Sequence, residues 1–323
     1  MKSTFCPHLW DGFTIIRTGD VFSCCKIKPV RLGNIYRTRL IDLVNVPEAV
    51  EHRRKSLEGE LWCYEECNFI RKNNGLGTIP DNVEIDYLEL KRLDILFGEQ
   101  CNISCIMCKQ AARRPRRPEV LNPDVLVEKV DISPFEDIIL QGGEPLFIPE
   151  CLAYMGYLES AGKRYTLLTN GLLIDDAMAD RLSRHANRVI ISLNAATREV
   201  HEKVNRGSRF DRVIDNIERL RSSRRRNGGV MRIIGRMTLT VPSLHEIPLF
   251  IQKYKELGFD GINFGYDKET VPGYLASNTD LTDQIRSEVV RAMKGANRGT
   301  IDSLRLEQLG LYPTQADGVR YQY

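Results

Sequence analysis

The sequence predicts an α/β protein in which a parallel sheet curves into an incomplete barrel, preceded by a small cysteine-rich module. Three observations support this fold class. From residue 91 onward, short apolar runs alternate with helical segments, as in parallel α/β architectures. The turn-rich stretch NNGLGTIPDN separates these repeats from the preceding part of the chain. That preceding part, residues 1–75, is rich in cysteine and is expected to form a compact unit of its own.

Composition is that of an ordinary globular protein. The chain has 323 residues, of which 42% are hydrophobic and 28% are charged. Its 46 basic and 43 acidic residues leave a formal net charge of only +3, so there is no overall nucleic-acid signature. No apolar run has the length or continuity of a signal peptide or a membrane span. Together with nine cysteines, this predicts a cytoplasmic protein whose thiols bind metal.

The cysteine-rich module opens at Cys6. The run FTIIRTGDVF favours two short strands around a Thr-Gly-Asp turn, a hairpin that would bring Cys24 back towards Cys6. LGNI is expected to end the loop that follows, and residues 38–58 carry a mostly helical pattern. Cys63 and Cys67 then stand four residues apart, a spacing that places two side chains on one face of a helix.

The rest of the chain divides into a linker over 76–90, a barrel over 91–270 and a C-terminal helical extension with a tail over 271–323. The strands predicted for the barrel are 93–97, 137–140, 165–169, 188–193, 231–240 and 261–266. The predicted helices are 208–226, 243–257, 280–295 and 300–309, the second of them starting with a capping box from Ser243 to Glu246. In such folds the functional site forms where loops leave the carboxyl ends of the strands.

The first barrel strand leads into CNISCIMC, which places Cys101, Cys105 and Cys108 in one loop. Three thiols so close together in a cytoplasmic protein indicate a soft metal or an iron–sulfur cluster. Structural zinc sites use four protein ligands, usually in two pairs. Three cysteines with no fourth close by would instead leave one corner of a four-iron cluster open. A zinc site and three buried thiols remain the alternatives.

The second strand leads into Gly142-Gly143-Glu144-Pro145. Two glycines let the backbone approach a ligand closely, and a neighbouring carboxylate can accept hydrogen bonds from an ammonium group. Taken alone, this run could equally be a tight turn. Its place at the end of the strand that follows the cysteine loop makes it a candidate binding motif.

CxxxCxxC followed by GGEP one strand later resembles the radical S-adenosylmethionine (radical SAM) superfamily. The resemblance implies a partial (β/α)6 TIM-like barrel, a [4Fe-4S] cluster on the three cysteines, and SAM at the open iron. It assigns GGEP to the amino group of SAM. It further implies reductive cleavage of SAM to a 5′-deoxyadenosyl radical that takes a hydrogen atom from a C–H bond. A reductant such as flavodoxin or ferredoxin would supply the electron.

The run ISLNAATREVHEKVNRG closely resembles the corresponding segment of that superfamily. Further candidate SAM contacts lie there, at other strand ends and beside the third cysteine: Met107, Thr169, Asn170, Ser192, Asn194 and Arg206. Met107 would pack on adenine, and the polar residues would face the ribose and carboxylate. Turn formation, capping or core packing is the alternative for each of them. Cys151 is expected to be a buried small hydrophobe rather than a ligand.

The order of cysteines, glycines and LGNI in the N-terminal module resembles the SPASM/twitch modules of radical SAM enzymes, which hold auxiliary [4Fe-4S] clusters. There the module usually follows the catalytic domain, whereas here it precedes it. The ligands that the resemblance implies are Cys6, Cys24, Cys63 and Cys67, with Cys25 as a substitute for Cys24. A zinc knob on the same thiols and a module without metal are the alternatives.

The substrate is the least constrained part of the prediction. Relatives with such modules often modify ribosomally made peptides, and others act on aminosugars. Because Cys6 stands close to the first residue, we expect no leader-peptide domain before it, which favours a sugar-like small molecule over a peptide. The reaction expected is an oxidation, a cross-link or an epimerisation.

Two arginine-rich runs bear on possible partners. ARRPRRP, directly after the cysteine loop, could attract an anionic substrate or could be a Pro-stiffened surface loop. RSSRRR ends a predicted helix and is expected to be a solvated face. RNA as a substrate rests on these runs alone, and no membrane partner is expected. A non-catalytic electron carrier is the remaining class, but such a protein has no use for GGEP.

Overall fold

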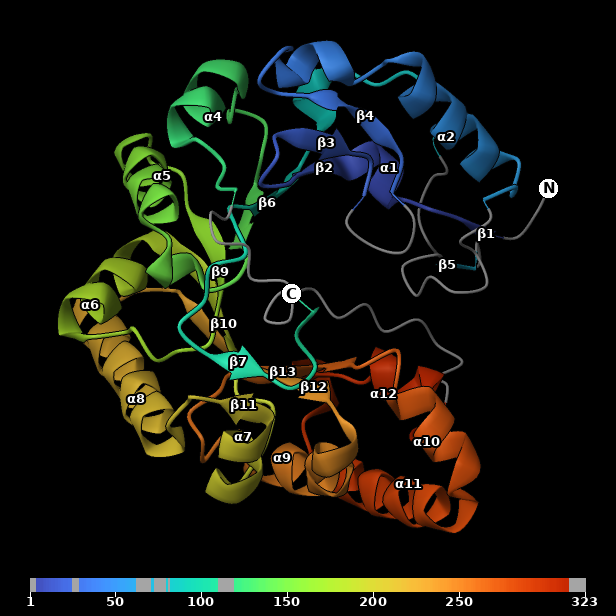
Figure 1. Cartoon of the computed structure of the whole chain (residues 1–323), viewed down its shortest axis with the longest axis vertical. Helices are drawn as coiled ribbons and strands as arrows, with labels where there is room; N and C mark the ends of the chain where they lie inside the picture. Colours follow the sequence, from blue (N-terminus) through green and yellow to red (C-terminus); the bar gives the residue numbers. More distant parts are fainter. Residues whose placement is uncertain are drawn as a thin grey trace. The chain divides into compact units, whose positions relative to one another are not determined.

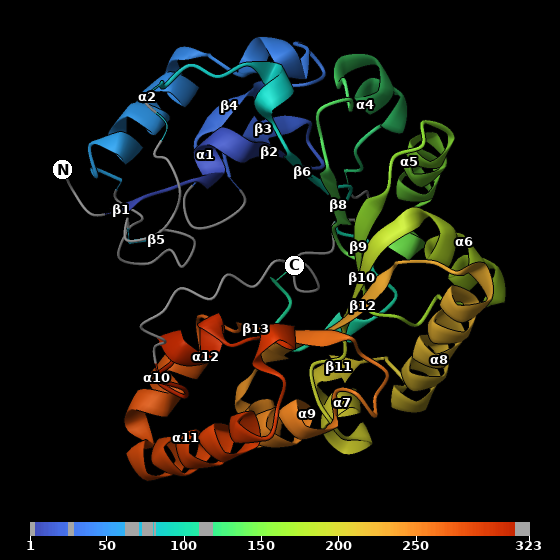
Figure 2. The ribbon, with the colours of Figure 1, turned by 180° about the vertical axis from the view of Figure 1, so that it is seen from behind.

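The computed structural model of the chain describes residues 4–24, 29–61, 71–72, 80, 82–109 and 119–313. The chain packs as two compact units, shown from opposite sides in Figures 1 and 2. Unit 1 comprises residues 1–100 and 115–166, and unit 2 comprises residues 101–114 and 167–323. Both units alternate strands and helices, as the sequence predicts. No helix in the described part of the chain is long and apolar enough to cross a membrane.

The sheet of unit 1 combines strands of the cysteine-rich module with strands predicted for the barrel. Its order is β8 (Asp137–Gln141), β6 (Arg92–Leu96), β2 (Gly12–Ile15), β3 (Asp20–Phe22) and β4 (Arg31–Asn34). β8, β6 and β2 run parallel, with Thr14 opposite Asp94, whereas β2, β3 and β4 are antiparallel. The predicted hairpin is therefore confirmed. LGNI contributes to β4 instead of ending a loop, because its backbone pairs with β3.

Short helices connect the strands of unit 1. They are α1 (His8–Asp11), η1 (Leu40–Leu43), α2 (Pro47–Leu57), η2 (Tyr87–Glu89), α4 (Pro123–Lys129), η3 (Pro145–Phe147) and α5 (Pro149–Ser160). α2 starts on a proline, which suits the first helical position, and the chain turns away after it at Gly59, where φ is +69°. Cys151 is completely buried in α5, as expected. A two-residue pairing of β1 (Thr4–Phe5) with β5 (Arg71–Lys72) completes the described elements of this unit.

Three strands of unit 2 lie where the sequence predicts them, whereas β14 (Ile301–Asp302) falls within the predicted helix 300–309, of which only Leu304–Gln308 is α-helical. β10 (Ala186–Ser192), β12 (Arg232–Leu239), β13 (Gly261–Tyr266) and β14 (Ile301–Asp302) pair in parallel in this order. β9 (Tyr165–Thr169), within which the division between the units falls, is the other neighbour of β10. A separate antiparallel pair joins β7 (Ser104–Cys105) to β11 (Asn205–Arg206).

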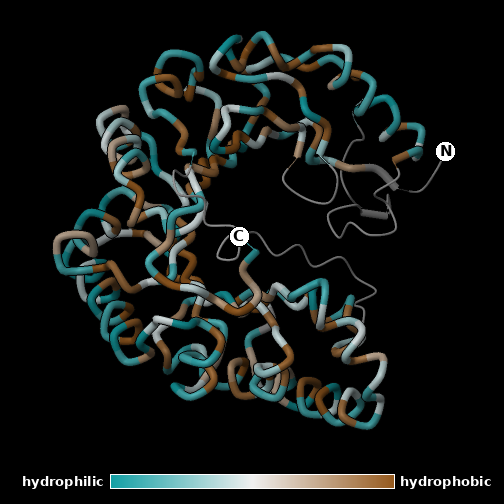
Figure 3. The backbone as a smooth tube through the Cα atoms, in the orientation of Figure 1, coloured by the Kyte–Doolittle hydropathy of each residue, from teal (hydrophilic) through white to brown (hydrophobic). Residues whose placement is uncertain are grey.

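The helices of unit 2 are α6 (Asp176–His185), α7 (Arg198–Val204), α8 (Phe210–Asn227), η4 (Val241–Glu246), α9 (Ile247–Lys253), α10 (Val271–Ser277), α11 (Thr279–Lys294), η5 (Arg298–Thr300) and α12 (Leu304–Gln308). In Figure 3 the tube of α11 alternates between hydrophilic and hydrophobic turns, in keeping with its buried Ile285, Val289 and Met293. The predicted capping box is wrong. Thr240 and Ser243 form the box, which starts the 3-10 helix η4, and Glu246 bonds elsewhere.

Candidate iron–sulfur and SAM site

The cysteine loop of unit 2 is fastened to the segment that follows α7. Cys105 lies opposite Asn205 in the β7–β11 pair, and the amide of Ile106 donates to the Val204 carbonyl at 3.0 Å. Within the loop, the amide of Cys108 donates to the Cys105 carbonyl at 3.1 Å, which closes a turn. Residues about a hundred positions apart in the sequence thus fix the backbone that presents the second and third thiols.

The three thiols of this loop are each partly buried. Burial, followed by the influence of Cys101 and Cys108, raises the pKa of Cys105 to about 12. Such a thiol does not ionise at neutral pH unless a metal stabilises the thiolate. In the described residues, no three metal-binding side chains could hold a single ion. Because each thiolate of a [4Fe-4S] cluster binds its own iron, thiols that do not converge on one point still fit such a cluster.

Thr169 and Asn170 form the turn that leaves β9. The Thr169 hydroxyl accepts from the Gly171 amide at 3.1 Å, and Asn170 Oδ1 accepts from the Leu172 amide at 3.0 Å. Asn170 Nδ2 also donates to Asn102 Oδ1 at 2.7 Å and lies 3.9 Å from Cys101 Sγ. The turn is therefore observed, and it brings Asn170 to the first cysteine as well.

A buried amide network lies behind the second cysteine. Asn205 is completely buried, and its Nδ2 donates to the Ser192 carbonyl at 3.1 Å. Its Oδ1 accepts from Asn194 Nδ2 at 2.8 Å and lies 3.5 Å from Cys105 Sγ. Asn194 has a φ of +62° and accepts from the Thr238 amide at 2.8 Å. Sequence reasoning missed Asn205, which directly precedes the predicted Arg206.

The last two predicted SAM contacts of unit 2 lie at the margins of this network. Met107 packs against the small apolar cluster of Ala195, Val200 and Val204, which is the core packing that the sequence left open. The backbone of Arg206 pairs with Ser104, and its side chain is exposed. Their roles towards SAM stay predictions, as do those of the other predicted site residues.

Glu246 stabilises the start of α7, and the sequence did not predict this role. Its carboxylate is buried and accepts from the amides of Ala196 and Thr197 at 2.7 and 3.2 Å, and from the Thr197 hydroxyl. A carboxylate at a helix N-terminus satisfies amides that have no partner within the helix. Glu246 therefore orients the helix whose end carries Asn205.

A buried histidine ties α7 to the end of β10. His201 Nδ1 donates to the Leu193 carbonyl at 2.6 Å, and Nε2 lies 2.7 Å from the Ser208 hydroxyl. Burial lowers the pKa of His201, although the Leu193 carbonyl and nearby carboxylates act in the opposite direction. The imidazole is therefore neutral at pH 7, with Ser208 donating to it.

GGEP, in unit 1, wraps the strand end that enters the cysteine loop. The amide of Gly143 donates to the Gly98 carbonyl and that of Glu144 to the Gln100 carbonyl, both at 2.8 Å. A Cβ on Gly143 would lie only 2.0 Å from the Gln100 oxygen, so no other residue fits there without moving the backbone. Glu144 is 1% exposed and accepts from the Leu146 amide at 3.1 Å. The motif thus fixes the residue directly before Cys101.

Two of the predicted auxiliary ligands, Cys6 and Cys24, lie in the described part of unit 1; Cys25, Cys63 and Cys67 lie outside it. Cys6 is 7% exposed and packs with Leu9 and Leu61. Its amide donates to the Ser56 hydroxyl at 2.9 Å. Ser23, directly before Cys24, has its hydroxyl 3.0 Å from His52 Nδ1. Both cysteine-bearing segments are therefore bonded to α2.

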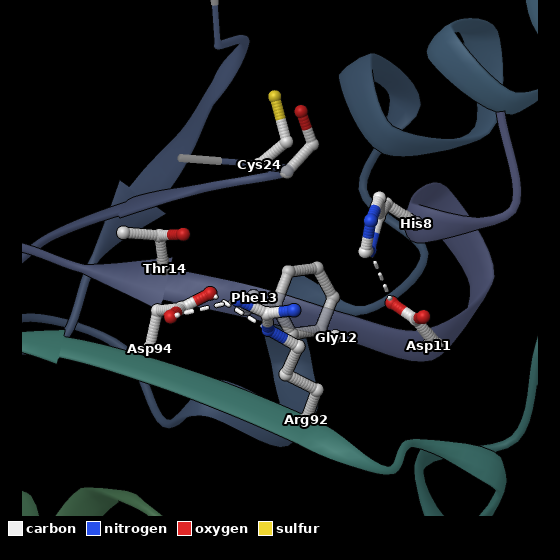
Figure 4. A pocket seen from close by; sticks show the side chains of 9 residues that line it. His8, Asp11, Gly12, Phe13, Thr14, Cys24, Arg92 and Asp94 are labelled. Carbon is white, nitrogen blue, oxygen red and sulfur yellow. Dashed lines mark hydrogen bonds and ion pairs between the residues drawn. The ribbon is translucent and has the colours of Figure 1, made fainter. Parts of the chain in front are cut away.

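A small hollow of about 20 Å³ lies beside Cys24 in unit 1 (Figure 4). Arg92 bonds to Asp94 on its lining at 3.0 and 3.2 Å, and Thr14 stands opposite Asp94 on the neighbouring strand. The Thr14 hydroxyl is buried and, in the described structure, has no hydrogen-bond partner. The arginine-rich run ARRPRRP, a candidate attractor of an anionic substrate, lies outside the described residues.

Family comparisons agree with this arrangement. The model of the radical SAM superfamily matches residues 95–247, and that of SPASM, an iron-sulfur cluster-binding domain, matches residues 6–68. Residues 95–247 therefore form a radical SAM domain. More particularly, the chain carries a SPASM module ahead of this domain. The predicted family, its SAM-bearing [4Fe-4S] cluster and the auxiliary iron–sulfur cluster are thereby confirmed.

Individual relatives are more distant. A probable GTP 3′,8-cyclase of Methanopyrus kandleri is 24% identical over 197 residues, 59% of this chain and 62% of the relative. An AdoMet-dependent heme synthase of Methanosarcina barkeri is 30% identical over 129 residues, 38% of this chain and 37% of the relative. The chain thus spans less than two thirds of either relative. The solved structure of Streptococcus suis SuiB bound to its precursor peptide SuiA has a TM-score of 0.48 and 18% identity, covering 93% of this chain and 71% of that one.

Proposed function

We propose that this protein cleaves SAM reductively to methionine and a 5′-deoxyadenosyl radical, and uses the radical to take a hydrogen atom from a substrate C–H bond. Cys101, Cys105 and Cys108 would hold the [4Fe-4S] cluster. The observation that supports the proposal is how the cysteine loop is held. The β7–β11 pair fixes its backbone, and GGEP fixes the strand end that directly precedes it. When bound, the cluster and SAM supply an electron and a carbon radical.

The chain's own residues would bind, orient and shield these groups. Glu144 is buried and engaged at Leu146, so we assign the SAM ammonium to backbone carbonyls of GGEP and give Glu144 the role of shaping the turn. The Asn170 side chain lies beside the sulfur of one loop cysteine, and the Asn205 side chain lies beside the sulfur of another. Both side chains would orient the cysteine loop. A flavodoxin or ferredoxin would act as reductant.

The auxiliary cluster of the SPASM module would sit on Cys6, Cys24, Cys63 and Cys67. In an oxidation or a cross-link it would accept the electron from the substrate radical. In an epimerisation, where the substrate loses no electron overall, it would only bind or orient the substrate. The hollow beside Cys24 has room for about one water molecule, so it does not bear on the substrate. A sugar-like molecule or a peptide is the substrate we propose.

A nucleotide-modifying radical SAM enzyme is the second candidate. The observation in its favour is the similarity to GTP 3′,8-cyclases, which covers 59% of this chain at 24% identity. Mass spectrometry of reactions with sugars, peptides and nucleotides, each with SAM and dithionite, separates the two. A product formed from GTP alone would favour the second candidate.

The catalytic proposal is tested by anaerobic reconstitution followed by an assay for 5′-deoxyadenosine in the presence of dithionite. We expect about eight irons per chain, four for each cluster, and SAM cleavage. Cys105→Ala should abolish cleavage and leave the auxiliary iron. Cys151→Ala is the matched control, because that cysteine is buried in α5, and it should leave both readings unchanged. Iron at the full level without any 5′-deoxyadenosine would refute the proposal and favour an electron carrier.

A further inference from the structure

One face of α2 is bonded to both described cysteine segments of the SPASM module (α2 in Figure 1). Ser56 accepts from the Cys6 amide, and His52 is paired with Ser23, directly before Cys24. His52 and Ser56 are four residues apart and so share a face of the helix. They are 6% and 0% exposed. This face therefore points into the module, towards the chain segments that carry the auxiliary ligands.

The position of α2 is itself fixed. Arg53 is 1% exposed and donates to the carbonyls of Leu9 and Val83 at 2.9 and 2.5 Å, and to that of Val44. An arginine held by several backbone carbonyls has little rotational freedom. His52, the neighbouring residue, is therefore presented from a rigid element.

The second ring nitrogen of His52, Nε2, makes no hydrogen bond within the described structure. Nε2 is buried and has no hydrogen-bond partner there, although buried polar atoms in native proteins almost always have one. Burial, with smaller effects of Lys55 and Arg53, lowers the pKa of His52 to about 4, so the ring is neutral at pH 7. A neutral ring carries one N–H. If the Ser23 hydroxyl donates to Nδ1, that N–H is on Nε2.

We infer that His52 donates its Nε2–H to a sulfur of the auxiliary cluster, and that this hydrogen bond raises the reduction potential of the cluster. The inference rests on the auxiliary cluster of the proposed function. A hydrogen bond to sulfur stabilises the reduced state most, because that state carries the greater negative charge. Ser23 then acts through His52, since it selects the tautomer that has a proton to give.

The test uses the full chain with Cys101, Cys105 and Cys108 all changed to Ala, so that only the auxiliary cluster remains. Redox titration followed by EPR would be compared for His52, His52→Met and His52→Gln. Met removes the donor, whereas the Gln amide can place an N–H near the position of Nε2. We expect His52→Met to lower the ratio of reduced to oxidised cluster at a fixed potential by up to about tenfold, about 59 mV for one electron. His52→Gln should restore most of it.

A second measurement separates tuning from a structural role. Exchange into D2O should remove a proton hyperfine coupling from the reduced cluster of the parent and of His52→Gln, and have no matching effect in His52→Met. Ser23→Ala should give an intermediate potential, because the ring is then free to adopt either tautomer. A full iron content with an unchanged potential in His52→Met would overturn the inference. So would loss of iron in both His52 variants, which would make His52 a structural support.

Failure of the underlying proposal looks different. If the parent with intact His52 and the three cysteine changes holds no iron, the auxiliary cluster is absent from this chain. In that case the inference also falls, but SAM cleavage by the unchanged protein would still stand.

Discussion

Asn205 Oδ1 lies 3.5 Å from Cys105 Sγ, across the two-residue pair in which these residues face each other. The same side chain bonds to Ser192 and Asn194 at the end of β10. The second cysteine is thus positioned by a strand end of unit 2 through a single buried amide.

Replacing Asn205 by Leu should therefore loosen the cysteine loop. The change leaves the Asn194 amide and a Ser192 carbonyl without their partner, so the free energy of unfolding should fall by about 2–4 kcal/mol. Iron retained after gel filtration should fall as well. Asn278→Ala is the control, since that partly buried asparagine bonds only locally, to the Tyr274 carbonyl. Normal iron retention in Asn205→Leu would show that the loop needs no support from β10.

Gly143→Ala should abolish SAM cleavage. The added Cβ would lie 2.0 Å from the Gln100 carbonyl oxygen, a backbone atom that cannot turn away. The strand end before Cys101 must then shift, and SAM affinity should fall at least tenfold, as measured by equilibrium dialysis. Gly273→Ala is the matched control, because a Cβ there meets nothing within 4 Å. In the middle of α10 it should raise stability slightly, by about 0.5–1 kcal/mol.

Glu246→Ala should destabilise the first turn of α7. Two amides and a hydroxyl lose their acceptor, which should cost about 2–3 kcal/mol in urea unfolding. Hydrogen exchange of the Ala196 and Thr197 amides should become faster than that of the α8 amides. Glu256→Ala, at an exposed position, should change neither quantity. Equal exchange rates in Glu246→Ala and the parent would refute this role.

His201 should make the protein less stable in mild acid. Its pKa is lowered by burial in the folded state and is about 6.5 in the unfolded chain. Below about pH 6.5 the unfolded chain takes up a proton that the folded protein refuses, so stability present at higher pH is lost as the pH falls. The difference in unfolding free energy between about pH 7.5 and about pH 5.5 should shrink in His201→Gln. An unchanged difference would mean that other groups dominate the acid response.

Local sequence patterns were sufficient to predict the strands that consist of a single apolar run. Strands β9 and β13 begin and end at the predicted residues, because each is a short apolar run bounded by turn residues. β4 was missed, since Arg31–Asn34 carries no apolar run and owes its form to pairing with β3. β4 therefore forms because β3 lies beside it, and its own sequence does not predict it.

The residues of the candidate site likewise divide into those that local sequence patterns predict and those that only the fold brings together. Cysteine spacing and GGEP are local and were visible in the sequence. Glu246 was expected to cap its own helix, but its partners are about fifty residues away at the start of α7. Asn205 and His52 likewise act through partners that only the folded chain brings to them. Composition gives no signal for such pairings, because the same residues cap, turn or face solvent equally well elsewhere.

The parallel pairing of β2 with β6 has a consequence for how the protein is made. These strands are about eighty residues apart, so the ribosome releases β2 long before its partner exists. Until β6 has been synthesised, the hairpin of β2 and β3 has an unpaired strand edge. The pairing of β2 with β6 is a slow, non-local step, and the unpaired edge is prone to aggregation before it occurs. Deleting the first ninety residues would move the hazard to β6, which would lose a neighbour. The SPASM module is therefore a poor candidate for removal as a dispensable appendage, and co-expression of the two pieces is the better way to separate them.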